Sequence, residues 1–134
     1  MIPDRIIEQG TLRTAGSRAS VEVRIPWYRA LPASCIEDAR LTVDGVTAPA
    51  ESVRWEMNGR TFTFAEMRDE VDEWWFPVDS AVLSGELAVA SANEHTVAVH
   101  LSLYIPYIII GDGEVLRIDE HDEKLMTTKE EVPA

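Results

Sequence analysis

The sequence contains a single cysteine and no long apolar run. Cys35 has no second cysteine to pair with, so an internal disulfide is excluded and nothing points to an oxidising compartment. No stretch approaches the roughly 20 apolar residues that cross a membrane as a helix, and the first residues lack the apolar run of a signal peptide. We therefore expect a cytoplasmic protein.

Positive charge is also scarce. Twelve Lys and Arg residues stand against 24 Asp and Glu residues, which gives a formal net charge of −12. This charge repels nucleic-acid phosphates and the anionic leaflet of a membrane, and the arginines are scattered singly rather than clustered. We therefore predict no nucleic-acid partner and no membrane partner.

Motifs for catalysis and phosphate binding are missing as well. The glycines lie mostly at turns, and Gly111–Gly113 lacks the lysine and the helix that follow a phosphate-binding loop. Cys35 has no histidine placed locally as a base, so a small buried core residue is the favoured interpretation. Acidic residues are numerous, but no pair stands apart as a glycosidase pair would. The sequence predicts no catalytic residue.

The three histidines do not form a metal-binding pattern. His95 and His100 are five residues apart on a predicted strand, so their side chains should point to opposite faces. His121 lies in the acidic run 119–123, which could bind a cation loosely but lacks the glycine and the ligand spacing of a calcium loop. A solvated charged stretch is favoured, and we predict no metal ion on this chain.

What the chain does have is a core-forming composition and a period of two. It is 134 residues long and 46% apolar, which is enough for one core. Apolar and polar residues alternate in 20–25 and, without a break, in 96–105, as expected for strands with one face on a core. Leu87 and Val89 suggest a further strand just before the second of these.

Two dipeptides predict tight hairpins, because Asp-Gly and Asn-Gly tolerate the positive φ angles of a two-residue turn. The first is Asp44-Gly45, which would pair Val43 with Val46 and Leu41 with Ala48. The second is Asn58-Gly59, which would pair Trp55 with Phe62 and Val53 with Phe64.

One short helix is predicted near 64–72, because Thr63 and Glu66 have the spacing of a capping box and Met67 and Val71 share a helix face. No alternation of strands and helices suggests a parallel sheet. We predict an all-β fold, an antiparallel β-sandwich or open barrel spanning 1–113. Residues 114–134 are predicted to form an acidic C-terminal tail or hook that packs on the domain or on a partner.

Adjacent aromatic residues stand out in three blocks near prolines. Neighbouring residues of an extended segment face opposite ways, so one of Trp74 and Trp75 needs a second apolar surface. A corner of the core explains such clusters in many proteins, but Trp, Tyr and Arg are also enriched at protein interfaces. The candidates for a partner interface or a substrate entrance are Trp27, Tyr28, Arg29, Trp74, Trp75, Phe76, Tyr104, Tyr107 and Ile109.

The same blocks carry a resemblance to a known family. In order, they are Val23-Arg24-Ile25-Pro26-Trp27-Tyr28-Arg29-Ala30-Leu31-Pro32, Ser34-Cys35-Ile36-Glu37, Val43-Asp44-Gly45, Asn58-Gly59-Arg60, Asp72-Glu73-Trp74-Trp75-Phe76 and Ile105-Pro106-Tyr107-Ile108. This series resembles the small (β) subunit of bacterial C-glycoside deglycosidases over residues 5–113. Residues 79–93 and those after Gly113 carry no part of the resemblance.

The resemblance implies a hetero-oligomer. In that family a barrel-like α subunit binds a divalent metal such as manganese and carries the acid–base residues. The complex, a lyase in type, cleaves the carbon–carbon bond between a 3-oxo-sugar and an aromatic aglycone. The β subunit is a sandwich-like accessory protein without catalytic residues. The residues leave open a stand-alone carbohydrate-binding or structural β-sandwich that forms homo-oligomers and, least favoured, an independent hydrolase that uses Glu and Asp pairs.

Overall fold

The computed structural model describes residues 6–15, 17–25, 30–68, 70, 72–76, 79–87, 89, 94–109, 111, 113–127 and 129–130. For residues 15, 106–109, 129 and 130 it describes the backbone alone.

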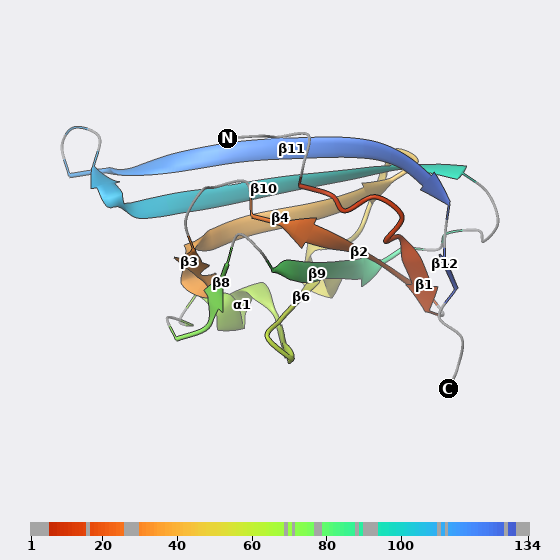
Figure 1. Cartoon of the computed structure of the whole chain (residues 1–134), viewed down its shortest axis with the longest axis horizontal. Helices are drawn as coiled ribbons and strands as arrows, with labels where there is room; N and C mark the ends of the chain where they lie inside the picture. Colours follow the sequence, from red (N-terminus) through yellow and green to blue (C-terminus); the bar gives the residue numbers. More distant parts are fainter. Residues whose placement is uncertain are drawn as a thin grey trace.

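The fold consists of two antiparallel layers and a small two-stranded sheet, as Figure 1 shows. The six-stranded sheet has the order β12-β1-β2-β9-β6-β7 and contains β1 (Arg13–Ala15), β2 (Arg18–Arg24), β6 (Arg54–Met57), β7 (Arg60–Phe62), β9 (Ser80–Glu86) and β12 (Lys129–Glu130). The four-stranded sheet has the order β11-β10-β4-β5 and contains β4 (Ile36–Val43), β5 (Val46–Thr47), β10 (Glu94–Ile109) and β11 (Val115–Thr127). Strands β3 (Leu31–Pro32) and β8 (Trp74–Trp75) pair with each other. Among the strand pairs of the described residues, only β1 and β12 run parallel. The all-β sandwich predicted from the sequence is confirmed.

The core lies between the two layers and is built from alternate residues of their strands. Val21 and Val23 of β2 face inward, and Ile25 is buried just beyond the strand. On β10, Val97, Val99, Leu101, Leu103 and Ile105 are all buried, as the unbroken alternation predicts. The predicted strand at Leu87 and Val89 is wrong, because β9 ends at Glu86 and Leu87 packs into the core just after it.

Both hairpins form at the predicted turns. Asp44 and Asn58 have φ angles of 51° and 55°, which places both in the left-handed region. At the first turn Val43 pairs with Val46, and the Ala48 N–H donates to the Leu41 carbonyl oxygen at 2.9 Å.

At the second turn Trp55 pairs with Phe62 as predicted. The predicted pairing of Val53 with Phe64 does not form. Strand β7 ends at Phe62, and Thr63 then caps helix α1 (Phe64–Met67).

Helix α1 begins at the predicted capping box. The Thr63 hydroxyl accepts the Glu66 N–H at 3.2 Å, and the Glu66 carboxylate accepts the Thr63 N–H at 2.9 Å. The helix is shorter than the predicted range, ending at Met67, which is buried. Two short 3₁₀ helices, η2 (Ala33–Cys35) and η3 (Ala50–Ser52), complete the described elements.

Strand β11 was not predicted from the sequence. Val115–Thr127 pairs with β10 along its length, from Glu94 opposite Thr127 to Ile109 opposite Val115. The first part of the acidic tail is therefore an edge strand of the four-stranded sheet. The division of the chain at residue 113 stays a prediction.

Candidate functional site

Several of the predicted aromatic residues meet at one end of the sandwich. Here β8 pairs with β3, so that Trp74 lies opposite Pro32 and Trp75 opposite Leu31. The next residues, η2, lead to Cys35, which contacts Tyr104 of β10. We call β3, η2, β8, Phe76 and Tyr104 the aromatic end. Figure 1 shows β3 and β8 toward its left side.

The two neighbouring tryptophans face opposite ways, as the period of two predicts. Trp75 is fully buried, with its ring edge-to-face on Trp55 at 4.9 Å between centroids, and its Nε1–H donates to the Asp79 carbonyl oxygen at 3.1 Å. Trp74 and Phe76 are 42% and 47% exposed. Trp75 therefore belongs to the core, whereas Trp74 and Phe76 are available to a second surface.

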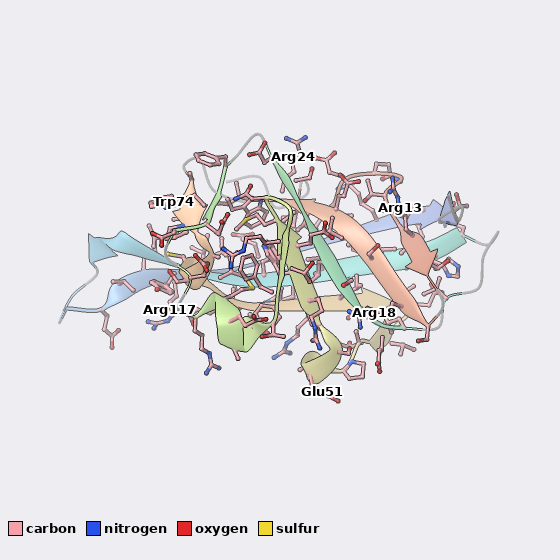
Figure 2. All side chains as sticks on the ribbon, turned by 90° about the horizontal axis from the view of Figure 1, so that it is seen from below. Arg13, Arg18, Arg24, Glu51, Trp74 and Arg117 are labelled. Atoms are coloured by element: carbon pink, nitrogen blue, oxygen red, sulfur yellow. The ribbon has the colours of Figure 1, made fainter. Side chains whose placement is uncertain are left out.

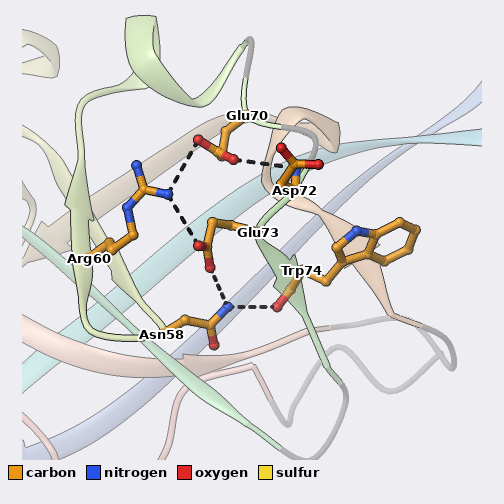
Figure 3. Close-up of polar contacts among 6 residues, drawn as sticks. All are labelled: Asn58, Arg60, Glu70, Asp72, Glu73 and Trp74. Atoms are coloured by element: carbon orange, nitrogen blue, oxygen red, sulfur yellow. Dashed lines mark hydrogen bonds and ion pairs between the residues drawn. The ribbon is translucent and has the colours of Figure 1, made fainter.

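A polar network holds the strand that carries Trp74 (Figure 3). Asn58, at the tip of the β6–β7 hairpin, donates from Nδ2 to Glu73 Oε2 at 3.0 Å and to the Trp74 carbonyl oxygen at 3.1 Å. Arg60 Nη1 lies 3.1 Å from Glu73 Oε1 and 3.6 Å from Glu70 Oε2. The hydrogen bond from Asn58, and then the one from Arg60, lowers the pKa of Glu73, so this carboxylate stays charged at neutral pH.

Cys35 and Tyr104 are two residues of the aromatic end that are more buried than Trp74 and Phe76. Cys35 is buried, as predicted, and is hydrogen-bonded with Tyr104 and Ser34. Burial raises the pKa of the Cys35 thiol and also that of the Tyr104 phenol. Because the thiolate is the nucleophilic form, a buried thiol with a raised pKa is poorly suited to catalysis. Tyr104 is half-buried and packs on the core, so it is less exposed than Trp74.

Five interface candidates remain, and they come from two segments of the chain. Trp27, Tyr28 and Arg29 lie outside the described residues. Tyr107 and Ile109 lie on β10, but their side chains are not described.

His95 and His100 lie on opposite faces of β10, as predicted. His95 is buried on the inner face of β10, while His100 is half-buried on the outer face, opposite His121 of β11. Within the described part of the chain, no group of three or more His, Cys, Asp or Glu side chains could hold a metal ion. The same part contains no helix that is long and apolar enough to cross a membrane.

Sequence reasoning missed the contribution of Asn58 and Glu73. The Asn-Gly pair predicted the turn. It did not predict that the Asn58 side chain would bind Glu73 and Trp74, which lie 15 and 16 positions further along the chain. Only the acidic residue just before the tryptophan pair hinted at a polar support there.

A comparison with known protein families finds a match that includes the residues of the aromatic end. Residues 6–107 match the family described as "C-glycoside deglycosidase beta subunit". The chain belongs to the C-glycoside deglycosidase beta subunit family. The match covers the strands from β1 to β9 and most of β10, including the whole aromatic end.

Relatives within this family align over nearly the full chain. The C-glycoside deglycosidase beta subunit of Microbacterium trichothecenolyticum is 70% identical over 94% of this chain and 96% of its own. One from Arthrobacter globiformis is 65% identical over 94% of this chain and 96% of its own. A 3'-dehydrocarminate deglycosidase beta subunit of a Microbacterium species is 37% identical over 97% of this chain and 98% of its own. Membership as a beta subunit implies a partner subunit.

Proposed function

We propose that this chain is the non-catalytic accessory subunit of a metal-dependent C-glycoside deglycosidase. The assembled enzyme, a lyase, cleaves the carbon–carbon bond between a 3-oxo-sugar and an aromatic aglycone. The observation that carries this proposal is the near-full-length identity of 70% with a protein named as such a beta subunit. A second relative is named for a 3'-dehydro compound, which supports an oxidised sugar as the substrate class.

The catalytic residues and a divalent metal, manganese by preference, are assigned to a barrel-like α subunit. The described residues of this chain do not fit a metal site, since their His, Cys, Asp and Glu side chains form no group that could ligate an ion. The Cys35 thiol is buried with a raised pKa and is not poised to attack a substrate. The role left to this chain is to bind and support the α subunit, in a cytoplasmic hetero-oligomer.

The test is co-expression of this chain with the proposed barrel-like α subunit from the same organism. We expect the two to co-purify and to cleave a 3-oxo-C-glucoside, with activity that requires both chains and is lost when a chelator removes the metal. The same barrel-like subunit expressed alone is the control. If that subunit alone is equally stable and equally active, the accessory role is refuted.

A further inference from the structure

We infer that the partner subunit binds the aromatic end and takes Trp74 and Phe76 into an apolar pocket whose rim carries Arg or Lys side chains. The existence of the partner rests on the proposed function. The location and chemistry of the interface rest on the residues of β8 and its surroundings.

The exposed side chains of Trp74 and Phe76 distinguish the aromatic end from the rest of the described surface. Four large apolar side chains of the described residues are exposed, namely Val46, Trp74, Phe76 and Leu125. The two aromatic ones lie two positions apart in the same extended segment, on either side of the buried Trp75, so they share its outer side. Large aromatic side chains that are kept out of the core are the residues that most often anchor protein interfaces.

Contacts on both sides of β8 hold Trp74 and Phe76 in their exposed positions. Trp75 is held by its contact with Trp55 and by its hydrogen bond to Asp79, and the Ala33 N–H donates to the Glu73 carbonyl oxygen at 2.8 Å. Trp74 could turn inward only if Trp75 left the core. Figure 3 shows the Trp74 ring pointing away from the Arg60–Glu73 network. Figure 2 shows that Trp74 and Arg117 lie toward the same end of the molecule.

Asn58, in the neighbouring β6–β7 hairpin, positions the segment that carries Trp74 and Phe76. Its two hydrogen bonds fix both the side chain of Glu73 and the backbone of Trp74. Arg60 adds a second contact to Glu73 and also lies 4.8 Å from the centre of the Phe62 ring. An interface whose backbone is already ordered loses less conformational entropy on binding.

The charge around the two aromatics favours a different chain over a second copy. Asp72 and Asp79 are exposed beside Trp74 and Phe76, whereas the nearby cation Arg60 is already paired with Glu70 and Glu73. Two copies that met through this surface would bring their aspartates together, which is repulsive. A partner with an apolar pocket and a basic rim complements both features.

The first experiment measures the affinity of the co-expressed barrel-like subunit for variants of this chain. We expect Trp74→Ala and Phe76→Ala each to weaken binding by about tenfold or more, as truncation of an interface anchor does. Leu125→Ala and Val46→Ala remove apolar side chains of β11 and β5 that are even more exposed than Trp74 and Phe76, and they should change the affinity less than about twofold. Thermal unfolding of each variant alone checks that it is folded.

The second experiment tests the positioning role of Asn58. Asn58→Gly keeps the left-handed turn, which glycine adopts without strain, but removes both hydrogen bonds. We expect this variant to weaken binding by about threefold to tenfold in the wild-type background and to have a smaller effect in the Trp74→Ala background, where only Phe76 remains to be positioned. An effect of the same size in both backgrounds would show that Asn58 does not act through Trp74.

The outcomes separate the two proposals. If wild-type chain forms no complex with the barrel-like subunit, the proposed function fails. If the wild-type complex forms but the Trp74→Ala and Phe76→Ala variants bind as tightly as wild type, the interface lies elsewhere and this inference alone fails. It also fails if these substitutions alter only self-association of the chain or only the KM of the assembled enzyme for its aromatic substrate.

Discussion

The Asp44 carboxylate lies 2.6 Å from Nδ1 of His95 and joins the β4–β5 turn to the start of β10. The other carboxylate oxygen of Asp44 accepts the Thr96 N–H at 2.9 Å, and the Asp44 N–H donates to the Thr96 carbonyl oxygen at 2.9 Å. The turn residue that sets the hairpin thus also fastens it to the next strand of the sheet. The hydrogen bond with His95, followed by that from Thr96, lowers the pKa of Asp44.

This lowered pKa predicts a loss of stability in acid. Because the folded chain holds Asp44 ionised more strongly than the unfolded chain does, its contribution is complete above the ordinary Asp pKa of about 3.9. The contribution is lost as the pH falls through the lower pKa of the folded state. We expect Asp44→Asn, which keeps a residue tolerant of positive φ, to flatten the dependence of the melting temperature on pH between about pH 5 and pH 2.

Circular dichroism melts at neutral and acidic pH measure this effect. The matched control is Glu51→Gln, which removes the same charge from an exposed side chain. A wild-type profile that runs parallel to the Asp44→Asn profile would contradict the role given to this carboxylate.

The parts of the fold that could be predicted from the sequence depend on local signals. The alternation from Val97 to Ile105 marks one buried face, and the Asn58-Gly59 turn sets the pairing of Trp55 with Phe62. The opposite orientations of Trp74 and Trp75 follow from the geometry of an extended chain. None of these needs knowledge of distant residues.

Strand β11 could not be predicted, because polar residues interrupt its inward row between Ile118 and Met126. Asp122 lies opposite Val99 and is buried, where an apolar residue would be expected. Its Oδ2 accepts the Ile7 N–H at 2.9 Å, a contact between residues 115 positions apart. The interpretation of 119–123 as a fully solvated stretch is therefore wrong at Asp122. At the aromatic end the same reason applies to Asn58, whose partners are distant in the sequence.

Asp122 is predicted to be a stabilising residue, unlike the acidic residue beside it. Besides Ile7, it accepts the Glu123 N–H at 2.9 Å and lies 2.7 Å from the Lys124 ammonium. Asp122→Ala leaves the Ile7 N–H without its acceptor, and we expect a loss of about 1–3 kcal/mol in the free energy of unfolding. The neighbouring Glu123→Ala, at an exposed position, should cost less than about 0.5 kcal/mol.

Urea denaturation of the two variants compares these costs directly. Hydrogen exchange should also show faster exchange of the Ile7 amide in the Asp122→Ala variant. Equal stability of the two variants would mean that the Asp122–Ile7 contact does not hold the N-terminal segment in place.

Gly85 of β9 has no room for a side chain. A Cβ atom built at Gly85 of β9 would lie 2.5 Å from Cβ of Ala48, just after β5. The Ser52 hydroxyl accepts the Glu86 N–H at 3.0 Å and donates to the Pro49 carbonyl oxygen at 2.7 Å, so neighbouring bonds hold both backbones in place. We therefore expect Gly85→Ala to destabilise the chain by about 1–3 kcal/mol through overpacking.

A compensating substitution distinguishes this close contact from a general need for glycine. Ala48→Gly removes the methyl group that the new Cβ would meet, although it costs up to about 1 kcal/mol through backbone entropy when made alone. We expect the double variant to be more stable than Gly85→Ala alone, because the two sites share one contact and their effects on the free energy of unfolding are not additive. Urea denaturation of the four chains measures this coupling. Strictly additive losses would show that Gly85 is required for a reason other than its contact with Ala48.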